Sequence, residues 1–290
     1  MKIINFLKLF IVLFILGLLV SFKDNLFQNY SLLFMPKEYK TIKRLVDKIA
    51  AKNYLGEKEI PFYIGSGTYM EVRAKELGLC KEEDCWYFNN LSPYKKYKYV
   101  KDINLNELIN QSYLFNGIEA YAWKGIVWLS KSTFRTYGDR KDWLSCTIGH
   151  ELSHIVFNDH IEQEIKLTEK LDEIKIQDLK KIEETEKLLD LQINRDSEKI
   201  ADNNAAKMLI NTGYPKRTCF DELTFLTQSS KLDIVTENDS THPGFIERSN
   251  SLMRFIDNYN KEKYLKSFNP YKWKWSYDRK KKILTFKPKN

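Results

Sequence analysis

Apolar residues recur along the chain first at helical and then at strand spacing. Between residues 36 and 52 they return every three to four positions, which predicts an amphipathic helix. Its buried face would carry Tyr39, Ile42, Leu45, Val46 and Ile49. Residues 60–64 are mostly apolar and run into a Gly-Ser-Gly turn, so we expect a short buried strand there.

Two hairpins are predicted further along the chain. Residues 120–123 and 126–129 are short apolar runs joined by a Lys-Gly turn. Residues 272–277 and 283–286 flank a polar turn and alternate well enough for a second hairpin. Helices together with these strands predict an α+β fold. A chain of 290 residues can bury one substantial core, so one main domain is expected.

Residues 68–112 show no clear period and are rich in lysine and tyrosine. We interpret them as an irregular insertion that contains an exposed strand at residues 94–100. Basic and aromatic residues also mix in nucleic-acid-binding surfaces. A solvated strand fits an exported protein better, and no nucleic-acid partner is expected.

Residues 161–190 form a highly charged segment with six lysines and ten acidic residues. Apolar residues recur every three to four positions, and neither proline nor glycine interrupts them. This pattern predicts a long amphipathic helix or a helical hairpin packed on the body of the protein. A lid over a cleft and a partner-binding coil are the alternatives.

Residues 1–22 have the plan of an export segment. Lys2 and Lys8 accompany an unbroken apolar run over residues 9–20. We expect an uncleaved membrane-anchor helix, because the stretch is just long enough to span and small residues for a cleavage site are scarce. A cleaved signal peptide is the alternative. The lysines would stay in the cytoplasm, which places the remainder outside it, in the periplasm or at the cell surface.

The formal charge of +8 is concentrated at one end of the chain. Residues 261–290 carry ten lysines and one arginine against two acidic residues, so 11 minus 2 gives +9 there. We therefore divide the chain into the segment 1–22, a main domain at 23–260 and a basic aromatic segment at 261–290. That last segment suits an anionic membrane surface, and an ordinary hairpin with a solvated face is the alternative.

The four cysteines are compatible with export. Cys80 and Cys85 are close enough to close a small loop in an oxidising compartment, and a disulfide and two free thiols are both open. Cys146 and Cys219 are far apart in sequence. We interpret Cys146 as a small core residue and not as a metal ligand.

Residues 147–156 contain His150, Glu151 and His154 in the spacing H-E-x-x-H. Positions four apart share one face of a helix, so both imidazoles can meet one metal ion while the glutamate reaches toward its open coordination position. Apolar neighbours at helical spacing predict a buried helix. The pattern indicates a zinc hydrolase, and an exposed helix with incidental histidines is the alternative.

A later segment supplies a third ligand. Glu198 and Asp202 are four apart on a predicted helix, so both carboxylates can point the same way. Two imidazoles and Glu198 would leave one position of a zinc ion open, which is the arrangement of a catalytic site. Asp202 is suited to accept the far ring N–H of a ligating histidine.

Three motifs together resemble the gluzincin metallopeptidases of the group that contains the CaaX prenyl proteases and the HtpX heat-shock proteases. That group shows H-E-x-x-H, E-x-x-A-D and T-H-P-x-x-x-x-R, and the chain has them at residues 150–154, 198–202 and 241–248. The motif core covers roughly residues 116–255. The resemblance implies a zincin-like fold. Zinc peptidases leave one strand edge beside the cleft free for an extended peptide, and we assign that edge to residues 125–129. An ordinary core hairpin at these residues is the alternative.

The resemblance also implies a mechanism. One Zn²⁺ per chain would activate a water, and Glu151 would take its proton and pass it to the leaving amine. His242 would stabilise the oxyanion, while Arg248 would fix its loop or add positive potential. We expect a metalloendopeptidase that cuts proteins or peptides in cell-envelope processing or quality control. A catalytically inactive envelope scaffold is the alternative, which the intact Glu151 disfavours.

Overall fold

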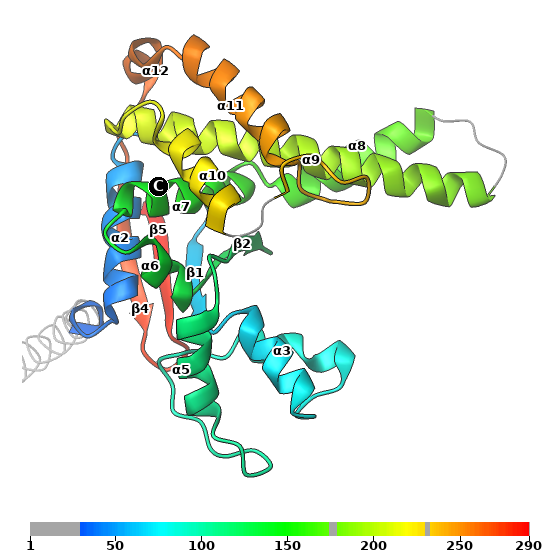
Figure 1. Ribbon diagram of the computed structural model, residues 1–290. Helices are drawn as coiled ribbons and strands as arrows, with labels where there is room; N and C mark the ends of the chain where they lie inside the picture. Colours follow the sequence, from blue (N-terminus) through cyan, green and yellow to red (C-terminus); the bar gives the residue numbers. More distant parts are fainter. Residues whose placement is uncertain (1–29, 174–178, 230–232, 290) are drawn as a thin grey trace, which may run out of the picture.

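The fold is built on a five-stranded mixed sheet with the strand order β2-β3-β1-β5-β4 (Figure 1). The computed structural model describes residues 30–173, 179–229 and 233–289. The parallel pair is β1 with β3, and the other neighbours run antiparallel. The strands are β1 (Ile60–Gly65), β2 (Ala120–Trp123), β3 (Ile126–Ser130), β4 (Lys272–Asp278) and β5 (Ile283–Lys289).

Helices make up most of the remaining described chain. The α+β fold class is therefore confirmed. The helices are α2 (Lys37–Ala50), α3 (Thr68–Glu76), α4 (Trp86–Asn89), α5 (Leu105–Phe115), α6 (Lys131–Tyr137), α7 (Lys141–Val156), α8 (Asp159–Glu173), α9 (Leu179–Thr212), α10 (Thr218–Ser229), α11 (Phe245–Asn258) and α12 (Lys261–Ser267), with a short 3-10 turn, η1 (Glu82–Asp84).

One large apolar core joins the sheet to α2, α7 and α9. It contains Phe62 of β1 and Phe286 of β5 together with Ile42 of α2, Leu144 of α7 and Leu209 of α9. Each large apolar side chain buried in this way contributes about 1.5–3 kcal/mol. The predicted helix at residues 36–52 and the predicted strand at 60–64 are thus confirmed, because their apolar faces form this core.

The helices α7 and α9 cross closely at Gly149. A Cβ on this glycine would lie 3.3 Å from the Cα of Ala205 and 3.4 Å from its Cβ. Small residues at a crossing let two backbones approach, and here the glycine directly precedes His150. The crossing also carries a hydrogen bond from Asn204 Nδ2 to Ser153 Oγ at 3.0 Å. The two motif-bearing helices are therefore held against each other at the motifs.

The charged segment predicted at residues 161–190 is a helical hairpin. α8 packs against α9, and the pair extends away from the body of the protein (Figure 1). Ile161 and Leu188 are more than half exposed on this arm. The hairpin alternative is confirmed, but the expected packing on the body of the protein is wrong for this arm (Figure 1). Its base begins directly after the helix with the two histidines.

A small lobe made by α3, α4 and α5 replaces the irregular insertion expected at residues 68–112. Its own apolar cluster includes Met70, Phe88 and Leu108. The strand predicted at residues 94–100 is wrong, because the segment instead loops around the side chain of Asn106. The Oδ1 atom of Asn106 accepts from the Tyr97 amide at 3.0 Å, and its Nδ2 donates to the Tyr97 carbonyl at 2.8 Å.

The two edge strands of the sheet are β2 and β4, and the edge that borders the histidine helix is β2, so the assignment of a free edge to residues 125–129 is wrong. β3 lies between β2 and β1, with Val127 paired to Ala122 on one side and to Phe62 on the other. The two runs differ in a way that explains this order. Residues 127–130 are all buried, as expected of an interior strand, whereas β2 alternates between half-buried and exposed residues.

The predicted C-terminal hairpin forms and completes the sheet. β4 and β5 pair along their length, and β5 also pairs with β1, where Phe286 lies opposite Ile60. The predicted anchor at residues 1–22 lies outside the described residues. Among the helices of the described residues, none is both long enough and apolar enough to span a membrane.

Both pairs of cysteines form disulfides. Cys80 bonds to Cys85 in the small lobe, which decides between the two alternatives for that pair. Cys146 bonds to Cys219, so its interpretation as a core residue alone is incomplete. The residue is buried, but the bond ties α7 to α10 across a sequence separation of 73 residues. The sequence did not predict this disulfide because the two cysteines come together only when α10 packs on α7.

Candidate active site

His150 and His154 project from one face of α7 toward Glu198 on α9. Their Nε2 atoms lie 3.1 Å apart. Glu198 places Oε2 at 3.4 Å from the His150 Nε2 and Oε1 at 3.5 Å from the His154 Nε2. Three ligand atoms from these residues lie within 4.8 Å of one another, so the group can hold a metal ion.

The two imidazoles suit zinc because the Nδ1 atom of each ring, which faces away from the other histidine, already has a carboxylate partner. His150 Nδ1 lies 3.0 Å from Asp202 Oδ1, and His154 Nδ1 lies 2.8 Å from Asp159 Oδ2. A carboxylate that accepts the Nδ1–H fixes the tautomer and leaves the Nε2 lone pair free for a metal. Two imidazoles and one carboxylate are the ligands of a catalytic zinc site with one open position.

Asp202 is itself held by Arg248 from α11. The guanidinium donates from Nε to Oδ2 at 2.7 Å and from Nη2 to Oδ1 at 2.6 Å, in a two-pronged arrangement. Both residues are buried. Burial alone raises the pKa of Asp202, but Arg248 and His150 outweigh it and keep the pKa below its usual value. The carboxylate therefore stays ionised beside His150.

Asp159 was not recognised from the sequence. It is the first residue of α8, is 8% exposed and accepts a hydrogen bond from Ser197 Oγ at 2.8 Å in addition to its contact with His154. The available signal was an acidic residue five positions after the second histidine. Asp159 and Asp202 thus give each histidine its own carboxylate partner.

Glu151 lies beside the candidate metal site formed by His150, His154 and Glu198, and it is 6% exposed. Burial raises the pKa of Glu151, and the nearby histidines only partly offset this effect. Burial also acts on Glu198, but there His150, His242 and His154 together hold the pKa well below its usual value. The two glutamates are therefore held in different electrostatic states, with Glu198 favoured as the carboxylate.

His242 reaches the same group from a loop before α11. Its Nδ1 lies 3.3 Å from Glu198 Oε2, and its side chain is 62% exposed. The hydrogen bond with Glu198 raises the pKa of His242 despite partial burial. Arg195 holds the loop by donating to the carbonyls of Ser240, Glu237 and Asn238 at 2.8–2.9 Å. The exposed ring is thus fixed at one end and free to meet a ligand.

Comparison with known families agrees with this geometry. The sequence model of peptidase family M48 matches residues 101–256, more than half of the 290 residues. The chain belongs to peptidase family M48. Comparison with curated proteins and with solved structures found no match. M48 members are zinc metallopeptidases, so the metallopeptidase prediction is confirmed at the level of the family. The narrower likeness to the CaaX and HtpX group stays a prediction.

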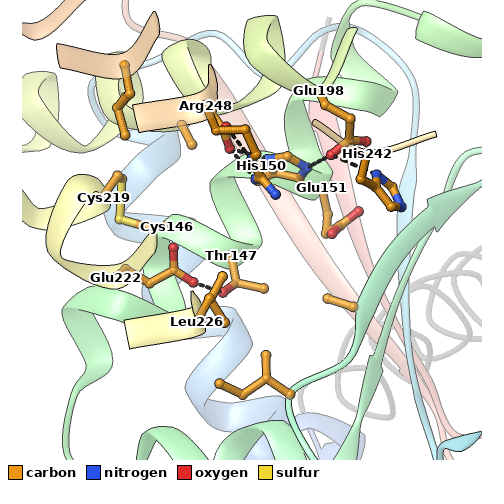
Figure 2. Close-up of a pocket in the computed structure, with 15 residues that line it drawn as sticks. Cys146, Thr147, His150, Glu151, Glu198, Cys219, Glu222, Leu226, His242 and Arg248 are labelled. Atoms are coloured by element: carbon orange, nitrogen blue, oxygen red, sulfur yellow. Dashed lines mark hydrogen bonds and ion pairs between the residues drawn. A yellow bond between two sulfur atoms is a disulfide. The ribbon is translucent and has the colours of Figure 1, made fainter. Parts of the chain in front are cut away.

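Two hollows meet at the metal-binding group of this M48 peptidase. A groove of about 700 Å³ runs along β2 and its turn to Glu151, His154 and Glu198. A recess of about 240 Å³ lies beside it and is drawn in Figure 2. Both are lined by Ala120, Glu151, Glu198 and His242. The groove and the recess therefore open onto the same catalytic candidates, Glu151, Glu198 and His242.

Proposed function

We propose that this M48 member is a zinc metalloendopeptidase whose metal is held by His150, His154 and Glu198. The observation that carries the proposal is the convergence of these three side chains beside the buried Glu151, at the end of a groove. The same motif order supports a gluzincin of the CaaX and HtpX type, with one zinc ion per chain.

Zinc at this position supplies Lewis acidity, which lowers the pKa of a water in the site and polarises a peptide carbonyl. Glu151 then accepts a proton from the attacking water and delivers it to the leaving amine. His242 donates a hydrogen bond to the oxygen that becomes negatively charged in the transition state. Asp202 and Asp159 hold the two ligand histidines in the tautomer that leaves Nε2 free, and Arg248 keeps Asp202 in place.

The free edge of β2 supports an extended peptide as the substrate. β2 pairs only with β3 among the described strands, so its other side leaves backbone groups available to a further strand. A peptide that adds to this edge by main-chain hydrogen bonds lies in the groove. Its carbonyls then pass Glu151 and His242, which is the placement that hydrolysis requires.

An inactive scaffold is the rival function, and one variant separates the two. Glu151→Gln removes the base but none of the three metal-binding side chains. We expect the purified protein to contain about one zinc ion per chain by elemental analysis and to degrade casein. Glu151→Gln should keep the zinc and lose turnover, whereas Glu262→Gln, at an exposed position of α12, should change neither. Unchanged casein cleavage by Glu151→Gln would exclude the proposed mechanism.

The proposal includes a membrane anchor at residues 1–22 and a catalytic domain outside the cytoplasm, serving envelope protein processing or quality control. The first described residues support it. Leu33 and Phe34 are 67% and 56% exposed, and the Arg279 guanidinium lies over the Phe34 ring at 5.8 Å from its centroid. Lys280 and Lys281 follow Arg279 and are exposed like it, so exposed apolar and basic side chains gather near this end, as suits anionic headgroups.

Fractionation tests the anchor. The protein should remain with membranes after an alkaline wash, and a reporter fused after Asn290 should behave as exported. A soluble protein with a new N-terminus near Phe22 would instead identify residues 1–22 as a cleaved signal peptide.

A further inference from the structure

The recess ends at a buried carboxylate that the proposed mechanism does not use. Glu222 on α10 lines the recess and is 6% exposed. Its Oε1 accepts hydrogen bonds from the Tyr137 hydroxyl and from Thr147 Oγ1, the latter at 3.1 Å. Within the described part of the chain, no hydrogen bond reaches its Oε2. This oxygen is not fully enclosed by protein atoms. One oxygen is thus positioned and the other is open to the recess.

The walls between Glu222 and the metal-binding group are largely apolar. They include Ile118, Ala120, Leu226 and Leu252, and Figure 2 shows Leu226 close to Glu222 and Thr147. The volume of about 240 Å³ lies below the roughly 300–1,000 Å³ of pockets that enclose a drug-sized ligand. The recess therefore suits one long side chain and not a whole peptide.

A peptide in the groove presents one side chain to this recess. Groove and recess share Glu151, Glu198 and His242, the residues around the bond to be cut. The side chain that enters the recess is consequently one that flanks this bond. Its stem would pack on the apolar walls, and its tip would reach Glu222.

The charges around Glu222 favour a cation at that tip. Arg248 is the basic residue among those that line the recess apart from the histidines, and it is engaged by Asp202 in the two-pronged pair. Burying an ionised carboxylate without a partner is costly, and a paired cation removes most of that cost. An apolar tip would leave Glu222 unpaired.

We propose that Glu222 selects substrates with a lysine or arginine next to the scissile bond, by pairing with that side chain at the end of the recess. The inference rests on the proposed peptidase function and names its substrate class. The ammonium or guanidinium donates to Oε2, while Tyr137 and Thr147 hold Oε1 in place. The apolar walls accept the methylenes of the same side chain.

The test compares two peptides that differ at one position. Cleavage of a degenerate peptide mixture by the full-length protein, read by mass spectrometry, first locates the scissile bond and its flanking residues. Matched quenched-fluorescence peptides with lysine or norleucine at the selected position then give a ratio of kcat/KM. We expect lysine to be favoured by about tenfold or more.

Two variants at neighbouring positions of α10 test whether Glu222 causes the preference for lysine. Glu222→Gln should reduce the lysine-to-norleucine ratio by about tenfold or more while leaving norleucine cleavage within about threefold. Asp221→Asn removes the same charge from an exposed position and should leave the ratio unchanged. An unchanged ratio in Glu222→Gln, or no preference for lysine in the unmodified protein, overturns the inference.

A measurement on the unmodified protein covers the case in which Glu222→Gln does not fold. Burial raises the pKa of Glu222 to about 7, and Tyr137, Arg248 and Asp202 are the titratable or charged groups that act on it. The lysine-to-norleucine ratio should therefore rise between pH 6 and pH 8. Catalytic groups titrate for both peptides alike and cancel in the ratio. A ratio that is flat or falls with pH contradicts the inference.

Different results contradict the peptidase function and the role of Glu222. A zinc-loaded protein that cleaves no peptide contradicts the peptidase function. A protein that needs Glu151 for cleavage but shows no basic preference contradicts only the role of Glu222.

Discussion

The imidazole Nδ1 of His154 lies 2.8 Å from Oδ2 of Asp159, the first residue of the helix that starts the charged arm. The relationship mirrors that of His150 with Asp202, at 3.0 Å. One histidine of the candidate metal site is thus oriented from α9 and the other from the base of α8. The arm is therefore joined to the site through a carboxylate and not only through packing.

Removing the Asp159 carboxylate should weaken zinc binding. In Asp159→Ala the Nδ1–H of His154 loses its acceptor, so we expect zinc affinity to fall about 10- to 100-fold, with activity partly restored by added zinc. Competition with a chromophoric chelator measures the affinity. Asp257→Ala, at an exposed position near the end of α11, is the matched control. Equal zinc affinities in the two variants would show that Asp159 does not orient His154.

Replacing His242 should lower the rate of catalysis and not the affinity for zinc. It is assigned to the transition state, so His242→Ala should keep its zinc and lose about 2.7–4 kcal/mol of transition-state stabilisation, read from kcat/KM. Asp202→Ala should instead lose zinc affinity and recover in excess metal. A His242→Ala protein that regains activity with added zinc would make His242 a support for the metal, since its ring lies 3.3 Å from Glu198.

Local patterns predicted which residues of the first two motifs share a helix face, because those residues lie on the regular helices α7 and α9. His150 and His154, and likewise Glu198 and Asp202, are four residues apart, so helical geometry alone places each pair on one face. What the sequence could not supply was the approach of the two helices. That approach depends on Gly149 and Ala205, whose significance appears only when the backbones are seen to cross.

The mistakes came from segments whose structure depends on distant contacts. β3 is interior because β1, more than sixty residues earlier, pairs with it in parallel. Residues 94–100 alternate like a strand but find no partner strand, and Asn106 satisfies Tyr97 instead. Glu222 attracted no notice because a glutamate on an amphipathic helix is ordinarily solvated, and it is the packing of α10 against α7, α9 and α11 that buries it.

The two disulfides should differ in their contribution to stability. Cys146–Cys219 spans a sequence separation of 73 residues and Cys80–Cys85 spans 5. In the chain-entropy account, loops of these sizes correspond to about 4 and about 2 kcal/mol. Replacing both cysteines of a pair by alanine should therefore lower the free energy of unfolding more for Cys146 and Cys219, as measured in urea. The reverse order would mean that strain or residual structure outweighs loop closure.

The buried Glu222 should make the protein less stable as pH rises. The pKa of this carboxyl is about 7 in the folded protein, against 4.5 for an unperturbed glutamate, with burial as the main cause. Between these values the folded state holds a proton that the unfolded state has released, so the free energy of unfolding falls as pH rises through this window and levels off above it.

Glu222→Gln stays neutral and should escape this loss. We expect its free energy of unfolding, relative to the unmodified protein, to be higher at pH 8 than at pH 5 by on the order of 1–3 kcal/mol. Urea unfolding of both proteins without metal gives the comparison, because the histidines titrate alike in both and cancel in the difference. Asp221→Asn, exposed on the same helix, should show no such pH dependence. If Glu222→Gln also tracks the unmodified protein at both pH values, Glu222 is ionised throughout and its pairing with Tyr137 and Thr147 is sufficient to hold the charge.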